Sequence, residues 1–167
     1  MVRWSDDRTR VPACHPLEVA PEPLVPDPHD VNEMVRTLFP GSDNGCVELT
    51  ATTALACREA GPEVLRPGGY ISGPVQFGLA DAVLWYLTFG AIGRIEPMAL
   101  TSELSIRFLR PAQGQVLWAR ATLDSLGRRN VVGTVHVWAD DNEDRPSSVA
   151  QGTYVLPATP TEYSGPG

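Results

Sequence analysis

The stretch PVQFGLADAVLWYLTFG, from Pro74 to Gly90, decides the architecture of this 167-residue chain. Its large apolar side chains point in almost every direction around a helical wheel. A helix that is apolar all round has to be buried on nearly all sides. The stretch therefore predicts a long helix enclosed by the rest of the domain.

Segments of alternating apolar and polar residues flank this helix and predict β-strands. One precedes it, and four follow it: Cys46–Cys57, then Met98–Leu109, Gln115–Asp124, Asn130–Ala139 and Ser147–Leu156. Turn-forming Gly, Pro, Asn and Asp residues separate the last four, as in an antiparallel meander. In the first of these four, strict alternation places Leu100, Leu104, Ile106 and Phe108 toward the core and Thr101 on the polar face. The predicted fold class is α+β, with a curved antiparallel sheet around a long buried helix.

The two ends of the chain differ in composition from this core. Residues 1–26 are rich in proline and are expected to form an extended arm. Residues 27–156 are the expected folded domain, which opens with a short amphipathic helix from Pro28. Residues 157–167, PATPTEYSGPG, carry no periodic apolar residues and are expected to form a flexible tail.

Composition excludes several classes of function. Acidic residues outnumber basic ones by 20 to 13, giving a net charge of -7, so we expect no binding to nucleic acid or to an anionic membrane. Every basic residue is an arginine, which excludes Schiff-base chemistry on lysine. Cys14, Cys46 and Cys57 lack the spacing of a disulfide framework or a zinc site, so we expect no metal. The polar N-terminal residues do not form a signal peptide, and we expect a cytoplasmic location.

Asp81 is the one charged residue within the predicted core helix. An ionised carboxylate among apolar side chains is costly unless it is paired, hydrated or used. On the helical wheel Asp81 shares a face with Pro74 and Gly78, where little bulk opposes the approach of a ligand or a second helix. Two interpretations follow: a structural aspartate bonded to an arginine or a backbone amide, and a catalytic acid.

Several landmarks occur in a fixed order around this acid. They are the loop RPGGYISGP from Arg66, Asp81 within LADAV, SIRFLRPA from Ser105, the pair Gly127-Arg128, and AQGTYVL from Ala150. In order and spacing, the segment from Gly68 to Tyr154 resembles the hotdog-fold acyl-CoA thioesterases of the phenylacetate-pathway (PaaI-like) type. The resemblance implies a hotdog domain over residues 27–156.

The resemblance also implies a catalytic arrangement. Asp81 would be the nucleophile or the general base that acts on the thioester of an acyl-coenzyme A. The backbone amide of Gly73, at the start of the helix, would stabilise the oxyanion, and Thr101 would assist the acid. In the family the acid usually works across a dimer interface, so the resemblance implies a dimer or tetramer that needs no cofactor.

Three positions depart from the family pattern. Arg66 stands where asparagine is usual, Ser72 replaces a histidine, and Pro74 replaces the second glycine. Arg66 offers no acceptor for a water molecule, although it can pair with Asp81 or with a carboxylate on the substrate. Arg66, Ser72 and the nearby Gln76 are therefore candidate substrate-binding residues.

Coenzyme A brings phosphate groups, and arginine suits their recognition. Arg110, Arg128 and Arg129 are the candidates at predicted strand ends, and Arg128 is favoured because Gly127-Arg128 matches the family turn. Phe77, Leu84 and Trp85 are either core residues or the lining of an acyl tunnel.

The leading hypothesis is a cytoplasmic acyl-CoA thioesterase that uses Asp81 and Gly73. The alternative is a noncatalytic hotdog protein that binds an acyl-CoA or another small ligand and has altered Arg66, Ser72 and Pro74. A hotdog dehydratase is disfavoured, because no suitably spaced Asp and His pair follows the loop.

Overall fold

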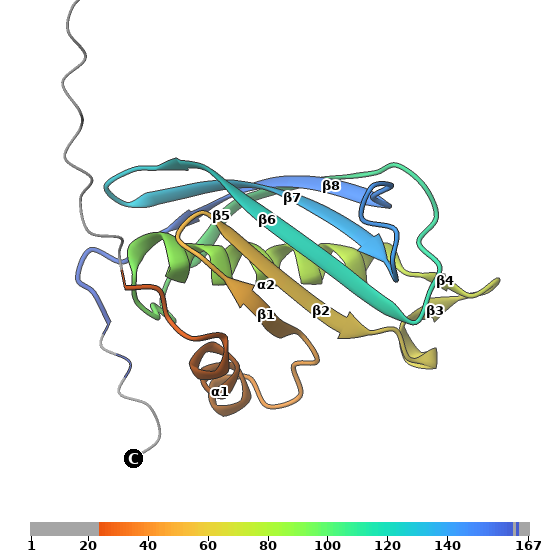
Figure 1. Ribbon diagram of the computed structural model, residues 1–167, viewed down its shortest axis with the longest axis horizontal. Coiled ribbons are helices and arrows are strands. Elements are labelled where there is room, and N and C mark those ends of the chain that lie inside the picture. Colours follow the sequence, from red (N-terminus) through yellow and green to blue (C-terminus); the bar gives the residue numbers. More distant parts are fainter. Residues whose placement is uncertain (1–23, 162, 164–167) are drawn as a thin grey trace, which may run out of the picture.

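The computed structural model describes residues 24–161 and 163 of the chain. A curved antiparallel sheet of six strands wraps around one long helix, α2 (Gly73–Ile92), as Figure 1 shows. The predicted α+β fold is confirmed. The proline-rich arm lies outside the described residues except for its last three positions, 24–26.

The sheet has the strand order β1-β2-β6-β7-β8-β5. Its strands are β1 (Gly45–Leu49), β2 (Thr53–Glu59), β5 (Leu100–Phe108), β6 (Val116–Leu126), β7 (Asn130–Ala139) and β8 (Ser148–Val155). A short 3-10 turn (Pro62–Val64) and a small hairpin of β3 (Leu65–Arg66) and β4 (Tyr70–Ile71) lead directly into α2.

The predicted four-strand meander is wrong at its first member. β6, β7 and β8 form a meander, but β5 pairs with β8 and becomes an edge of the sheet, while β6 pairs with β2. Alternation along a segment records which face is buried and carries no information on which strands are neighbours.

The segment predicted as one strand, Cys46–Cys57, is a hairpin of β1 and β2. At its turn the Thr50 amide donates to the Thr53 carbonyl (2.8 Å). The Thr50 hydroxyl accepts from the amides of Thr52 (3.2 Å) and Thr53 (2.9 Å). These local bonds let a threonine-rich sequence reverse direction without the usual glycine.

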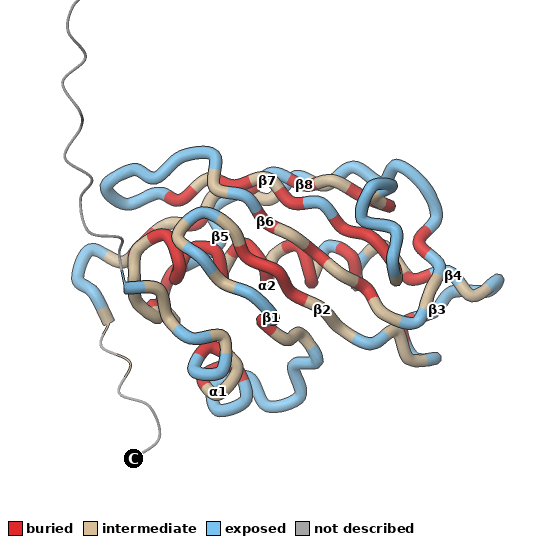
Figure 2. Tube along the Cα trace, in the orientation of Figure 1, coloured by how far each residue is buried: buried red, intermediate tan, exposed pale blue. Residues whose placement is uncertain are grey.

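Small residues on the concave face of the sheet allow α2 to lie close to it. Ala54, Ala56, Ala119 and Ala121 are buried there, against helix residues such as Leu79. Figure 2 shows the buried residues concentrated along α2 and the inner strands, with the outer turns exposed. By length and composition α2 could cross a membrane, but here it is the core helix that the sheet encloses.

The predicted first helix is confirmed as α1 (Pro28–Leu38). The Asp27 side chain caps its start by accepting from the His29 amide (2.7 Å). The Asn32 side chain donates to the Cys46 carbonyl and accepts from the Cys46 amide, both at 2.8 Å. These two bonds hold α1 against β1, beside the second half of α2.

The C-terminal segment contacts the end of α2. The Thr161 amide donates to Oε2 of Glu96 (2.8 Å), whose side chain is fully buried. Tyr163 packs against the core. The tail expected to be flexible thus makes defined contacts at these two described positions.

Candidate active site

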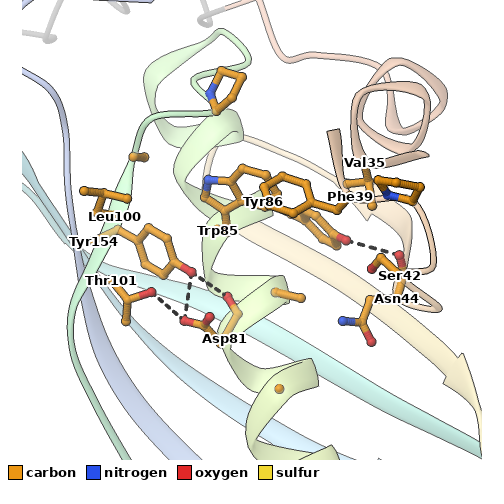
Figure 3. A pocket seen from close by; sticks show the side chains of 15 residues that line it. Val35, Phe39, Ser42, Asn44, Asp81, Trp85, Tyr86, Leu100, Thr101 and Tyr154 are labelled. Carbon is orange, nitrogen blue, oxygen red and sulfur yellow. Dashed lines mark hydrogen bonds between the residues drawn. The ribbon is translucent and has the colours of Figure 1, made fainter. Parts of the chain in front are cut away.

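A cavity of about 550 Å³ opens between the middle of α2, the end of α1 and the beginning of β5. Figure 3 shows the side chains that line it. Most of the wall is apolar or aromatic, and Asp81 supplies its carboxylate.

The Asp81 carboxylate is held from one side. Its Oδ1 accepts a hydrogen bond from the Thr101 hydroxyl (2.8 Å) and another from the Tyr154 hydroxyl (2.8 Å), drawn as dashed lines in Figure 3. The Tyr154 hydroxyl also lies 3.1 Å from the Asp81 carbonyl oxygen. Oδ2 accepts no hydrogen bond from the described residues, so one oxygen is fixed while the other remains available for chemistry.

A β-bulge brings Thr101 to this site. The pairing of β5 with β8 is regular from Phe108 to Glu103 and then skips one residue before Thr101. The bulge reverses the alternation, so Thr101 turns toward Asp81 while Leu100 is 64% exposed. The prediction that Thr101 faces away from the core was wrong for this reason.

Tyr154 was not predicted as a site residue. It lies opposite Thr101 in the β5–β8 pairing, on the concave face of β8. Burial, and then the negative charge of Asp81, raise the pKa of Tyr154, so its hydroxyl stays protonated as a donor. Two features of the sequence could have identified Tyr154 as a site residue: its inward position in the alternation of β8, and its place in the motif AQGTYVL.

Aromatic rings form much of the cavity wall. Phe39 meets Trp85 edge to face, with ring centroids 5.5 Å apart, and Tyr86 lies beside them. Of the three predicted tunnel residues Trp85 lines the cavity, whereas Leu84 is buried against the sheet and Phe77 is exposed elsewhere. The Tyr86 hydroxyl donates to the Asn44 carbonyl (3.2 Å) and ties α2 to the loop after α1.

Gly73 lies at a different depression, about 460 Å³ in volume, at the start of α2. Its walls include Tyr70, Phe108 and Arg110. No described residue accepts a hydrogen bond from the Gly73 amide, as expected at a helix N-terminus. Eight residues of helix separate Gly73 from Asp81, or ~12 Å along the axis at 1.5 Å per residue. The structure does not bring the two together within one chain.

The other residues predicted at the helix start are also remote from Asp81. Arg66 is exposed on β3 and is not part of the Asp81 cavity. Ser72 is the N-cap residue of α2, but its side chain makes no capping hydrogen bond. An ion pair between Arg66 and Asp81 is absent from the described residues of the chain.

Gln76 is 3% exposed, although its predicted role was to bind substrate. Its side chain is bonded to Ile71, Ser147 and Ser148, all within the protein. It also lines the Gly73 depression, but its amide oxygen and one N–H are bonded within the protein.

The candidate phosphate-binding arginines fall into two groups. Arg128 is exposed on the turn between β6 and β7, and no described carboxylate pairs with it. Arg129 donates from Nε (3.2 Å) and Nη2 (3.1 Å) to the Leu156 carbonyl, so it holds the end of β8. Arg110 donates from Nη1 to the Pro146 carbonyl and lines the Gly73 depression.

The described cysteines offer no second nucleophile. Burial, and secondarily the charge of Asp27, raise the pKa of the Cys46 thiol to about 12, which keeps it protonated. Cys57 is a partly buried thiol whose pKa burial also raises. Among the described residues, no group of three or more His, Cys, Asp or Glu side chains is placed to hold a metal ion.

Comparisons with known proteins agree with this fold. A family model described as the thioesterase superfamily matches residues 68–145. A solved structure from Silicibacter sp., described as a candidate thioesterase, is 28% identical, with a TM-score of 0.70 over 80% of this chain and 94% of that one. Residues 68–145 therefore match the thioesterase superfamily, and the domain around them has the hotdog fold.

Solved structures of lower sequence identity share the fold. The Escherichia coli PaaI protein from the phenylacetic acid degradation operon is 16% identical, with a TM-score of 0.63 over 80% of this chain and 97% of its own. A Streptococcus mutans protein solved with acetyl CoA is 17% identical, with a TM-score of 0.61 over 72% of this chain and 94% of its own. The search of curated proteins gave no match.

Proposed function

We propose that this protein is a thioesterase that hydrolyses an acyl-coenzyme A and that Asp81 acts on the thioester. The supporting observation is the carboxylate on the cavity wall, whose Oδ1 is held by two hydroxyls. Holding one oxygen fixes the direction of the other. Oδ2 is then placed to activate a water molecule or to attack the thioester carbon.

The site is completed by a second copy of the chain. A reacting carbonyl has to lie within ~3 Å of both the oxyanion donor and the catalytic acid. Gly73 and Asp81 of one chain are ~12 Å apart along the helix, too far to serve the same carbonyl. The Gly73 amide that faces Asp81 therefore comes from the other subunit.

The edge strand β5 is the surface that such a dimer uses. Its backbone pairs on one side only, and large apolar side chains are exposed along it and beyond its ends: Met98, Leu100, Phe108 and Leu109. Antiparallel pairing of two β5 edges about a twofold axis brings the Thr101 end of one strand to the Phe108 end of the other. Thr101 contacts Asp81, and Phe108 lines the Gly73 depression, so the two half-sites meet.

The reaction then needs groups from both chains. With Asp81 as general base, its carboxylate takes a proton from water, and the resulting hydroxide attacks the thioester carbon. The carbonyl oxygen becomes an oxyanion that the Gly73 amide and the positive end of α2 stabilise. Collapse of the intermediate breaks the carbon–sulfur bond, and the proton held by Asp81 passes to the departing thiolate, which releases a carboxylic acid and the coenzyme A thiol and restores the Asp81 carboxylate. The aromatic cavity takes the acyl group, and Arg128 contacts a coenzyme A phosphate.

A panel of acyl-CoAs with thiol release as the readout tests this function. Asp81→Asn keeps the size of the side chain and its acceptor oxygen but cannot take a proton or attack. We expect turnover to fall by about 10²–10⁴-fold while the melting temperature changes little. An Asn variant that is destabilised but retains full turnover would show that Asp81 is structural. Tight acyl-CoA binding without hydrolysis by the wild type would favour the noncatalytic alternative.

A further inference from the structure

The start of α2 is tied to the sheet by a buried polar cluster. Gln76 Nε2 donates to the Ile71 carbonyl (3.3 Å), and its Oε1 accepts from the hydroxyls of Ser147 (2.9 Å) and Ser148 (3.1 Å). The three side chains are 3%, 3% and 0% exposed. Most of the other residues that α2 buries are apolar.

The partners fix the orientation of the Gln76 amide. The Ile71 carbonyl can only accept, so the amide nitrogen has to face it. The amide oxygen is then left for the two hydroxyls. Every strong hydrogen-bonding direction of this amide except one N–H has a protein partner, which holds the first turn of α2 in one position.

Ser147 connects this cluster to three strands. Its amide donates to the Val137 carbonyl (2.7 Å) at the end of β7. Its carbonyl accepts from the amides of Leu109 (2.8 Å) and Arg110 (3.2 Å), just after β5. Gln76 therefore locks the helix start to the same point where β5, β7 and β8 meet.

Gly73 lies about one helical turn before Gln76 and two residues after Ile71, whose carbonyl accepts the hydrogen bond from Gln76. The first turn of a helix lacks half of its backbone hydrogen bonds, and the Ser72 side chain does not cap this one. Gln76 anchors this turn from within the helix, and backbone bonds from the Ile71 amide to Ala112 (2.9 Å) and from the Ser72 amide to Val64 (3.1 Å) anchor the residues just before Gly73.

We propose that Gln76 is a positioning residue that holds the Gly73 amide in the direction an oxyanion requires. This inference rests on the proposed thioesterase function. Gln76 does not touch the substrate and acts through the backbone between Ile71 and Pro74. Oxyanion stabilisation depends on donors that are already in place when charge develops, so a loosened turn lowers the rate without weakening binding.

Gln76→Leu removes all three bonds and keeps a side chain of similar size. Loss of an oxyanion donor costs about 10²–10³-fold in kcat, so we expect its misplacement to cost about 10- to 100-fold, with KM changed less than about twofold. Ser148→Ala, which removes one bond, should show a smaller loss and guards against poor folding of the first variant. Thr88→Val is the matched control, because it removes a buried hydrogen bond to Leu84 (2.9 Å) on the same helix, far from Gly73.

A second measurement is independent of activity. The backbone order parameter of Gly73, measured by NMR in the intact protein, should fall from the rigid range near ~0.85 toward ~0.6 in Gln76→Leu and stay unchanged in Thr88→Val. Gln76→Leu with wild-type kcat and a rigid Gly73 would overturn the inference. Wild-type protein without thioesterase activity would instead overturn the proposed function, and the order parameter would still decide the role of Gln76.

Discussion

At the scale of single residues, the two hydroxyls on Asp81 Oδ1 differ in their surroundings. Within one chain Thr101 lies on the exposed edge strand, whereas Tyr154 is buried by its own chain, with a raised pKa that keeps its proton in place. A hydrogen bond to a charged group is worth about 1.5–3 kcal/mol, and more of that is realised where water is excluded. Tyr154 is therefore the stronger of the two supports.

Tyr154→Phe should lower kcat about 10- to 100-fold and leave the KM for acyl-CoA nearly unchanged. The ring still fills its place in the core, so the loss reports the missing hydroxyl. Thr101→Val is the companion variant, and its loss should be smaller. Steady-state kinetics on both variants provide the measurement, and a Tyr154→Phe enzyme with wild-type kcat would remove Tyr154 from the mechanism.

At the scale of elements, the surroundings of two glycines in α2 predict that substitution by alanine changes the stability of the protein in opposite directions. A Cβ on Gly90 would lie 2.1 Å from the Thr50 carbonyl oxygen, in the turn between β1 and β2. A Cβ on Gly78 would have no atom within 4 Å. Alanine is the better helix former by about 1 kcal/mol at either position.

Gly78→Ala should therefore stabilise the protein by about 0.5–1 kcal/mol. Gly90→Ala should destabilise it by about 2 kcal/mol or more, since overpacking against backbone outweighs the helix preference. Chemical denaturation of both variants tests the pair. Equal effects of the two substitutions would contradict the close approach of α2 to the β1–β2 turn.

These elements also show how much of the fold and of the site could be predicted from the sequence. The pattern from Pro74 to Gly90 and the alternation of the later strands predicted α2, β6, β7 and β8 within two residues. The Thr50 turn and the β5 bulge were missed because each depends on local hydrogen bonds that interrupt the alternation. Asp81 stood out as a charge among apolar residues, but Tyr154 and the buried state of Gln76 depend on contacts across more than 70 residues.

At the scale of the whole molecule, three buried acids predict loss of stability in alkali. Burial raises the pKa of Cys46 from 9.0 to about 12, and those of Tyr86 and Tyr154 above the ordinary 10.0. Below about pH 8 all three groups are protonated in both the folded and the unfolded chain. At higher pH the unfolded chain releases protons, first from Cys46 and then from the two tyrosines, that the folded chain retains, so rising pH favours unfolding.

The melting temperature should consequently fall as pH rises from 9 to 11, with each group contributing up to about 1.4 kcal/mol per pH unit. In Tyr86→Phe one of these groups is gone. The variant starts from a lower melting temperature, because the bond to Asn44 is lost, but its decline with pH should be shallower. Identical slopes for variant and wild type would exclude Tyr86 from the effect.

The central claim for the assembled molecule is that two chains share each active site. It predicts that two variants that are inactive alone regain thioesterase activity when their chains form mixed dimers. Gly73→Pro removes the oxyanion amide while suiting the first helical position, and Gly73→Ala keeps the amide as its control. In both variants the added Cβ lies 3.1 Å from the Phe108 ring, so Gly73→Ala measures the effect of the Cβ alone, without the proline ring and with the amide kept. Gly73→Pro and Asp81→Asn should each be inactive alone, because every site in either homodimer lacks one group.

The most direct measurement is the thioesterase activity of these two variants after they are unfolded together in equal amounts and refolded. Half of the resulting dimers are mixed, and each mixed dimer holds one intact site, with Gly73 from one chain and Asp81 from the other. The predicted result is about one quarter of wild-type activity, as random assembly of a twofold dimer requires. No recovered activity in a sample where mixed dimers are shown to form would contradict the shared site.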